Sequence, residues 1–83
     1  MDNDNRLSVI SVIIEDAEAV QAVNGLFHEY SGYIVGRMGI PYRDRGLSII
    51  CVVLDAPQTV ASALSGRIGM LQGVSTKTIT TKQ

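Results

Sequence analysis

The chain has 83 residues, a net charge of −1 and a single cysteine, and its length fits one domain. Hydrophobic residues make up 46% of it and charged residues only 18%, against roughly 25% charged in an average soluble domain. The slight negative charge argues against a basic nucleic-acid-binding domain, and the lone cysteine excludes an internal disulfide. The lone cysteine also fits a reducing, cytoplasmic setting, and the apolar runs are far shorter than the ~20 residues that a membrane helix needs, so we expect no membrane segment.

Hydrophobic periodicity predicts four strands and two helices. Two segments, 6–15 and 47–54, are rich in β-branched residues and apolar on both faces, which is typical of central strands. Asp16 and Gly32 are the expected N-cap and left-handed C-cap of the first helix. In chain order we expect a disordered tail over 1–5, then one domain over 6–83 with strands over 6–15, 33–40, 47–54 and 74–81, a helix over 17–30, a turn over 41–46 and a helix starting at Asp55-Ala56-Pro57.

Apolar residues at helical spacing mark the buried side of each predicted helix. They are Val20, Val23, Phe27 and Tyr30 in the first helix and Val60, Leu64 and Ile68 in the second.

The element order β-α-β-β-α-β predicts a ferredoxin-like α+β fold. Two right-handed βαβ units then give a four-stranded antiparallel sheet of order 4-1-3-2, with both helices on one face. The two strands that are apolar on both sides occupy the centre of this sheet, so pattern and topology agree.

A sheet covered by helices on one side exposes the apolar side chains of its other face. Large exposed apolar patches are rare on monomers, and the second strand is an edge that could pair with its twin. We therefore expect a homodimer or a homotetramer, and the alternative is a monomer that tolerates an exposed apolar face.

The segment from Gly36 to Gly46 holds the best candidates for a binding site. Its arginines can bind carboxylate or phosphate by paired hydrogen bonds, its glycines allow close backbone approach, and its tyrosine offers a ring and a hydroxyl. The alternative is a solvated turn whose arginines pair with Asp44 or bridge subunits. The candidate ligand-binding residues are Gly36, Arg37, Gly39, Tyr42, Arg43 and Arg45.

Few residues of the sequence point to catalysis or to metal binding. The one histidine, His28, is expected near the C-terminal end of a helix, where it interacts favourably with the helix dipole. Cys51, in a central strand, reads as a small buried hydrophobe. We predict no catalytic residues, no cofactor and no metal site, with His28 and Cys51 as weak metal candidates if symmetry brings copies together.

Several segments together resemble the iron-only hydrogenase system regulator family, which consists of small bacterial proteins of about this length. The turn before the last strand, Leu71-Gln72-Gly73-Val74, also resembles the corresponding turn of ACT domains. The segments that resemble the regulator family are His28–Tyr30, Val35–Arg43, Val53–Pro57 and Ala63–Gly66.

This resemblance implies an ACT-like form of the ferredoxin-like fold, related to the regulatory domain of nickel-responsive repressors, and a role in regulating the iron-only hydrogenase system. Nickel-responsive repressors also carry a ribbon-helix-helix segment, for which five residues before the first strand leave no room. They bind nickel through several histidines and a cysteine on strands, and only Cys51 could match. Amino-acid-binding ACT domains often use a glycine after the first strand, where this chain has Glu15-Asp16.

We therefore predict a non-catalytic oligomeric regulatory module that senses a small anionic ligand or a partner protein. Two alternatives stay open. One is a direct transcription factor that contacts DNA through the arginine segment, which would show salt-dependent DNA binding but which the net charge of −1 disfavours. The other is a metal-handling protein of hydrogenase maturation.

Overall fold

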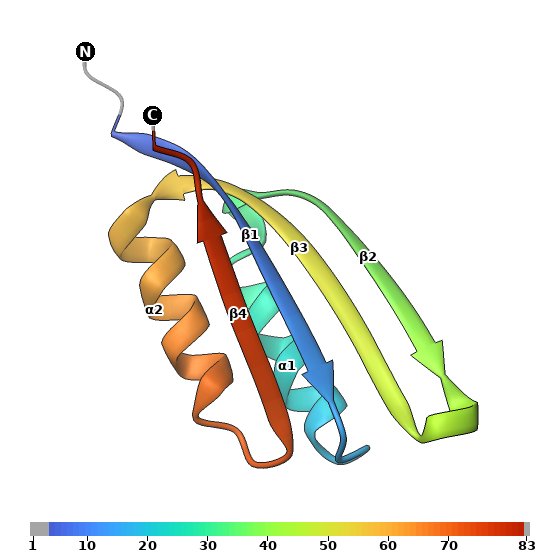
Figure 1. Cartoon of the computed structure of the whole chain (residues 1–83). Helices are drawn as coiled ribbons and strands as arrows, with labels where there is room; N and C mark the ends of the chain where they lie inside the picture. Colours follow the sequence, from blue (N-terminus) through green and yellow to red (C-terminus); the bar gives the residue numbers. More distant parts are fainter. Residues whose placement is uncertain (1–3, 83) are drawn as a thin grey trace.

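The computed structural model describes residues 4–82 and forms an α+β fold of one sheet and two helices (Figure 1). The predicted tail over 1–5 falls partly outside this range, and the first strand begins at its last residue, Asn5. The elements are β1 (Asn5–Ile14), α1 (Ala19–Glu29), a 3₁₀ turn η1 (Ser31–Tyr33), β2 (Ile34–Tyr42), a 3₁₀ turn η2 (Arg43–Arg45), β3 (Leu47–Pro57), α2 (Gln58–Gly69) and β4 (Val74–Thr80).

The sheet is antiparallel with the strand order β2-β3-β1-β4. Read from the other edge, this is the predicted order 4-1-3-2, so the ferredoxin-like fold class is confirmed. The central pair β1–β3 is in continuous register from Asn5 opposite Pro57 to Ile14 opposite Ser48. The edge strand β2 pairs with β3 and has one irregularity between Ile34 and Gly36.

Both helices pack on the same face of the sheet, behind it in Figure 1. Alternate residues of β1 and β3 point into this layer because side chains of a strand alternate between its two faces. The buried core of the fold consists of Ile10, Val12 and Ile14 from β1, Ile50, Val52 and Leu54 from β3, Ala19, Val23 and Phe27 from α1, and Ala61, Leu64 and Ile68 from α2.

The predicted start of the second helix was wrong by three residues. Asp55, Ala56 and Pro57 continue β3 and pair with residues 5–7 of β1, and α2 begins at Gln58. The residue before a proline is biased toward extended backbone, which keeps Ala56 in the strand, and Pro57 itself is extended with ψ 146°. As a result Ala61 is buried where Val60 was expected, and Val60 is half-buried.

The ends of the first helix also differ from the prediction. Asp16 lies two residues before the N-cap, Glu18, and its carboxylate accepts the Glu18 backbone N–H at 2.9 Å in a turn that precedes the helix. Gly32 does not take the left-handed conformation. The chain instead tightens after Tyr30 into the turn η1, where the N–H of Tyr33 bonds the Tyr30 carbonyl at 3.0 Å.

Left-handed backbone occurs at two other glycines among residues 4–82, Gly46 and Gly73. Gly46 closes the hairpin between β2 and β3, and its N–H bonds the carbonyl of Arg43 at 3.1 Å. This hairpin extends sideways beyond the helices (Figure 1). Neither helix in the described part of the chain is long and apolar enough to span a membrane.

Candidate functional site

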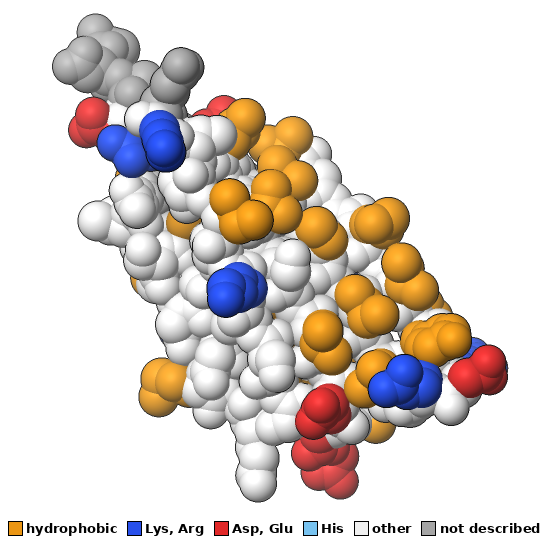
Figure 2. Space-filling view, in the orientation of Figure 1, with side chains coloured by type: hydrophobic (Ala, Val, Ile, Leu, Met, Phe, Trp, Pro, Cys, Tyr) orange, Lys and Arg blue, Asp and Glu red, His pale blue; other side chains and the backbone are white. Residues whose placement is uncertain are grey.

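The face of the sheet that the helices leave uncovered is rich in apolar side chains. Space-filling representation shows them as a broad band over β1, β3 and β2 (Figure 2). Many are large and well exposed, with Ile79 at 71% and Met38 at 60% of their full accessibility. By strand alternation the face comprises Leu7, Val9 and Ile13 of β1, Leu47, Ile49, Cys51 and Val53 of β3, Met38, Ile40 and Tyr42 of β2, and Ile79 of β4.

Charged residues are scarce on this uncovered face. Within the strands it carries Asp55 of β3 and Lys77 of β4, one acid and one base. The face therefore has no net charge that would oppose its pairing with a surface of the same composition.

The structure divides the six predicted ligand-binding residues between two faces and a turn. In the β2–β3 ladder Arg37 pairs with Val52 and Gly39 with Ile50, and both partners belong to the core on the helix side. Gly36 and Tyr42 pair with Val53 and Leu47 and lie on the uncovered face. Arg43 and Arg45 lie in the turn η2.

These positions do not form one cluster. Arg37 and Arg43 are six residues apart along an extended strand, which corresponds to roughly 20 Å. A single small ligand therefore does not reach both, and the binding candidates fall into a helix-side set, Arg37 with Gly39, and a separate turn.

Arg37 is held by two residues of α1. Its Nη2 donates a hydrogen bond to Asn24 Oδ1 at 2.7 Å, and its Cζ lies 5.0 Å from the centroid of the Phe27 ring, within the range of a cation–π contact. The sequence reasoning did not connect either partner to the site. The available signal was their i, i+3 spacing, which places Asn24 and Phe27 on one side of the helix.

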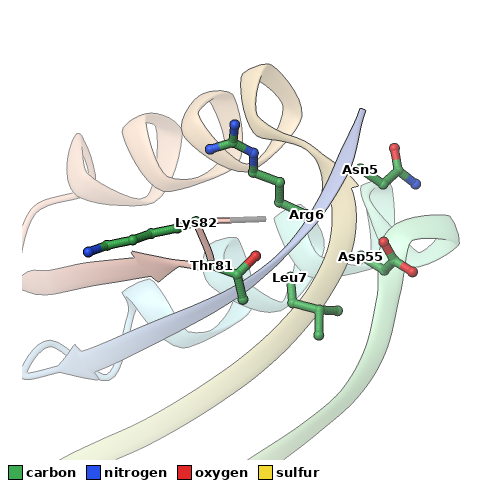
Figure 3. Close-up of a pocket in the computed structure, with 6 residues that line it drawn as sticks. All are labelled: Asn5, Arg6, Leu7, Asp55, Thr81 and Lys82. Carbon is green, nitrogen blue, oxygen red and sulfur yellow. The ribbon is translucent and has the colours of Figure 1, made fainter. Parts of the chain in front are cut away.

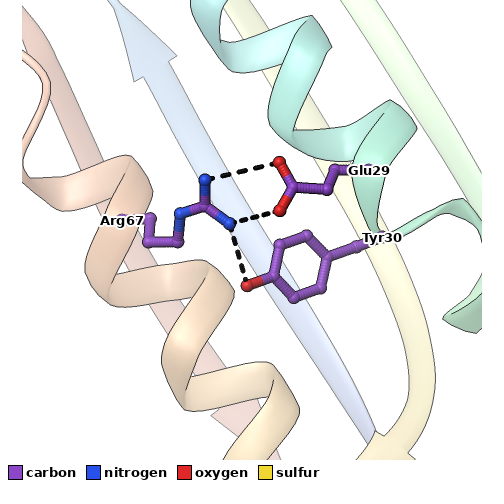
Figure 4. A network of polar contacts seen from close by, with 3 residues as sticks. All are labelled: Glu29, Tyr30 and Arg67. Carbon is purple, nitrogen blue, oxygen red and sulfur yellow. Dashed lines mark hydrogen bonds and ion pairs between the residues drawn. The ribbon is translucent and has the colours of Figure 1, made fainter.

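The second arginine cluster joins the two helices. Arg67 of α2 forms a two-pronged ion pair with Glu29 of α1, with Nη1–Oε2 at 2.7 Å and Nη2–Oε1 at 3.3 Å, and Nη1 also donates to the Tyr30 hydroxyl at 3.3 Å (Figure 4). The hydrogen bonds from Arg67 lower the pKa of the Glu29 carboxyl below its ordinary value and raise the pKa of the Arg67 guanidinium. This cluster is charge-compensated and links elements of the scaffold.

The two weak metal candidates lie on different elements. His28 is exposed on the last turn of α1, and Cys51 is half-buried on the uncovered face of β3. Within residues 4–82 no three His, Cys, Asp or Glu side chains gather as a metal site requires.

A shallow depression at one end of the sheet also carries charge. Its lining residues come from the start of β1, the end of β3 and the segment after β4 (Figure 3). The side chains of Arg6, Asp55 and Lys82 point in different directions there, and Arg6 bonds Gln58 of α2 at 3.3 Å. The charges do not converge on one point, so the depression lacks the geometry of a binding site.

The fold and these surfaces define a small ferredoxin-like α+β module with one uncovered apolar face. Residues 6–78 match the family model described as "TM1266-like: Iron-only hydrogenase system regulator, putative", and the chain belongs to this family. No functionally curated protein matches the chain.

One solved structure supports this assignment, and a second shares the fold. The structure of the uncharacterized protein TM1266 from Thermotoga maritima is 33% identical, with a TM-score of 0.89 over 94% of this chain and 99% of that one. A formyltetrahydrofolate deformylase from Pseudomonas putida KT2440 is 14% identical, with a TM-score of 0.63 over 88% of this chain. This chain covers only 28% of the deformylase, and the likeness concerns the fold alone.

Proposed function

We propose that this chain is a non-catalytic regulatory module of the iron-only hydrogenase system that works as a homo-oligomer, with two copies packed through their uncovered sheet faces. The regulatory role follows the description of its family. The assembly is carried by one observation, the band of exposed apolar side chains on that face.

The size of the face suits a second copy of the chain. Four strands spaced about 4.8 Å apart and roughly eight residues long give a footprint of roughly 500 Å² per copy, comparable to the largest apolar patches of monomers, which often mark interaction sites. Two such footprints give roughly 1,000 Å², near the lower limit of a specific interface. Pairing at the exposed edge strand β2 would add area, which accounts for a tetramer as well as a dimer.

Composition also favours a second copy. Two pleated sheets of like curvature stack about 10 Å apart and interdigitate their side chains, and this face presents one positive and one negative side chain to its partner. Burying the exposed part of each apolar side chain would contribute roughly 25 cal/mol per Å². The ligand of such a module is a small anion or a partner protein, because Arg37, Arg43 and Arg45 have no acidic partner within the described range.

Two exposed methionines provide a matched pair of variants that test the assembly through the uncovered face. Met38 lies on the uncovered face, and Met70, 85% exposed, follows α2 on the helix side of the molecule. Met38→Glu places a charge in the proposed interface, so sedimentation velocity should show a loss of oligomer at micromolar concentration. Met70→Glu should sediment like the wild type. A wild-type protein that stays monomeric up to several hundred micromolar would overturn the assembly.

The regulatory part is tested separately in a host that carries iron-only hydrogenase genes. Deletion of the gene should change hydrogenase transcript or activity levels, and wild type and Met70→Glu should restore them. Met38→Glu should fail to restore them if regulation needs the oligomer. Unchanged levels after deletion would contradict the regulatory role.

A further inference from the structure

A shallow groove lies on the helix side of the molecule between α1 and the edge strand β2. Its lining includes Val20 and Asn24 of α1, Arg37, Gly39 and Pro41 of β2, and Ile50 of β3. The groove is hollow because Gly39 stands between Arg37 and Pro41 in the row of β2 residues that face α1. A β-carbon built on Gly39 would have no atom of the described residues, 4–82, within 4 Å.

The guanidinium of Arg37 stands at this groove with its charge uncompensated. Its partners in residues 4–82 are the neutral Asn24 amide at 2.7 Å and the Phe27 ring at 5.0 Å. Both hold the guanidinium in place without neutralising it. The guanidinium of Arg67, by contrast, is neutralised by its ion pair with the Glu29 carboxylate.

A guanidinium has five N–H donors, and the bond to Asn24 uses one of them. The remaining donors include a pair that can bind the two oxygens of a carboxylate in parallel. Because Asn24 and Phe27 already orient the side chain, less conformational entropy is lost when an anion binds. The neighbouring side chains Val20, Pro41 and Ile50 are apolar and suit a short hydrocarbon substituent.

We propose that the α1–β2 groove binds a small carboxylate that bears a short apolar substituent, with its carboxylate on Arg37 and its apolar part over Gly39. This inference rests on the proposed function and deepens it, since it names the ligand class and the site that the regulatory module would sense. One guanidinium matches a monoanion better than a phosphate dianion, whose second charge would lack a partner in the groove.

The test is titration of ¹⁵N-labelled protein with hexanoate, followed by NMR. Hexanoate should cause saturable shifts of the Gly39 backbone amide and the Asn24 side-chain amide. Its neutral analogue hexanamide and inorganic phosphate should bind at least about tenfold more weakly, because each lacks one half of the recognition. Equal shifts with hexanamide, equal binding of phosphate, or no saturation with hexanoate would overturn the proposal.

Three variants locate the site. Arg37→Gln should weaken hexanoate binding at least about tenfold, and Gly39→Leu, which fills the hollow while keeping Arg37, should abolish it. Arg67→Gln removes the other helix-side arginine near α1 and should leave the hexanoate affinity unchanged. If Gly39→Leu binds hexanoate normally, the groove is not the site.

Failure of this inference can be told apart from failure of the proposed function. Sedimentation velocity of the same samples reports the oligomer independently of the titration. An oligomer that ignores hexanoate contradicts the carboxylate site only, whereas a monomer that binds hexanoate through Arg37 contradicts the assembly only.

Discussion

Gly73 and Asp16 approach so closely that a β-carbon on Gly73 would lie 2.5 Å from the β-carbon of Asp16. The contact joins the turn before β4 to the turn after β1, and the Gly73 carbonyl accepts the Glu15 N–H at 2.7 Å. Gly73 also has a left-handed φ of 77°. Space and backbone conformation therefore both require glycine at this position.

Gly73→Ala should destabilise the fold by about 2–3 kcal/mol or more, because a strained backbone angle and a steric clash add together. Urea unfolding at fixed protein concentration measures the change. Gly46→Ala is the matched control, since Gly46 has a similar φ of 65° but open space around it, and should cost only about 1 kcal/mol. Equal losses for the two variants would show that the contact with Asp16 relaxes at no cost.

Thr76→Val should leave stability unchanged or raise it by about 1 kcal/mol. The Thr76 hydroxyl is buried on the helix side of β4, and its oxygen has no hydrogen-bond partner among residues 4–82. A buried hydroxyl without a partner costs free energy, and valine has the same shape without the polar atom. Urea unfolding at fixed protein concentration tests this.

Ser8→Ala is the comparison variant for Thr76→Val, because it removes a buried hydroxyl that does have a hydrogen-bond partner. The Ser8 hydroxyl is also buried, but it shares a hydrogen bond of 2.8 Å with the Thr80 hydroxyl across the β1–β4 pair. Its removal leaves the Thr80 group without this partner and should cost about 1 kcal/mol. A loss of stability in Thr76→Val as large as in Ser8→Ala would mean that Thr76 has a partner such as a buried water.

The ion pair between Glu29 and Arg67 should make a part of the stability depend on pH. The hydrogen bonds from Arg67 lower the pKa of the Glu29 carboxyl in the folded state below its ordinary value of 4.5. A carboxyl with a lowered folded pKa stabilises the fold above the unfolded pKa and loses that contribution as the pH falls through the folded value. The effect is modest because both side chains are about half exposed.

Glu29→Gln should therefore be less stable than the wild type at pH 7, and the difference should shrink toward pH 3. Urea unfolding of both proteins at the two pH values is the measurement. High salt at pH 7 should reduce the same difference, since salt screens exposed ion pairs. A difference that is constant with pH would show that the pair contributes through packing and not through charge.

The element order and the right-handed βαβ rule predicted the sheet order, and the two-sided apolar pattern of β1 and β3 agreed with it and predicted an apolar uncovered face. That signal is strong because alternation along a strand repeats over many residues. The start of α2 was not predictable from Pro57 alone, since proline suits a helix start as well as an extended strand end. Pairing of Asp55 and Ala56 with β1 decided between the two, and pairing is a property of the folded sheet.

The sequence predicted an anion-binding segment, which stays a prediction, and it did not predict how the residues of that segment are arranged. Arginine and glycine in the segment from Gly36 to Gly46 indicated anion binding. The irregularity at the start of β2 sets which residues face the helices, and a shift of one residue reverses every side chain of a strand. The sequence analysis also ended this strand at Ile40 and left Tyr42 in a turn, whereas β2 continues to Tyr42. It therefore did not assign Arg37 and Gly39 to the helix side and Tyr42 to the uncovered face.

Cys51 reports directly on whether the uncovered face is covered in solution. Its half-buried side chain lies on that face and pairs across the ladder with Met38. If two copies pack through the face, the thiol of the native wild type should react slowly with the reagent 5,5′-dithiobis-(2-nitrobenzoic acid). Ile79→Glu places a charge on the same face two strands away from Cys51 and should accelerate the reaction at least about tenfold by shifting the protein to monomers, and dilution of the wild type should do the same.

Met70→Glu is the control for this reaction, since it adds the same charge on the helix side of the molecule and should react at the wild-type rate. Complete reaction in urea gives the total thiol for each protein. A wild-type thiol that reacts at one rate at every protein concentration, and as fast as the thiol of Ile79→Glu, would mean that the face meets water and would contradict packing of two copies through their sheet faces.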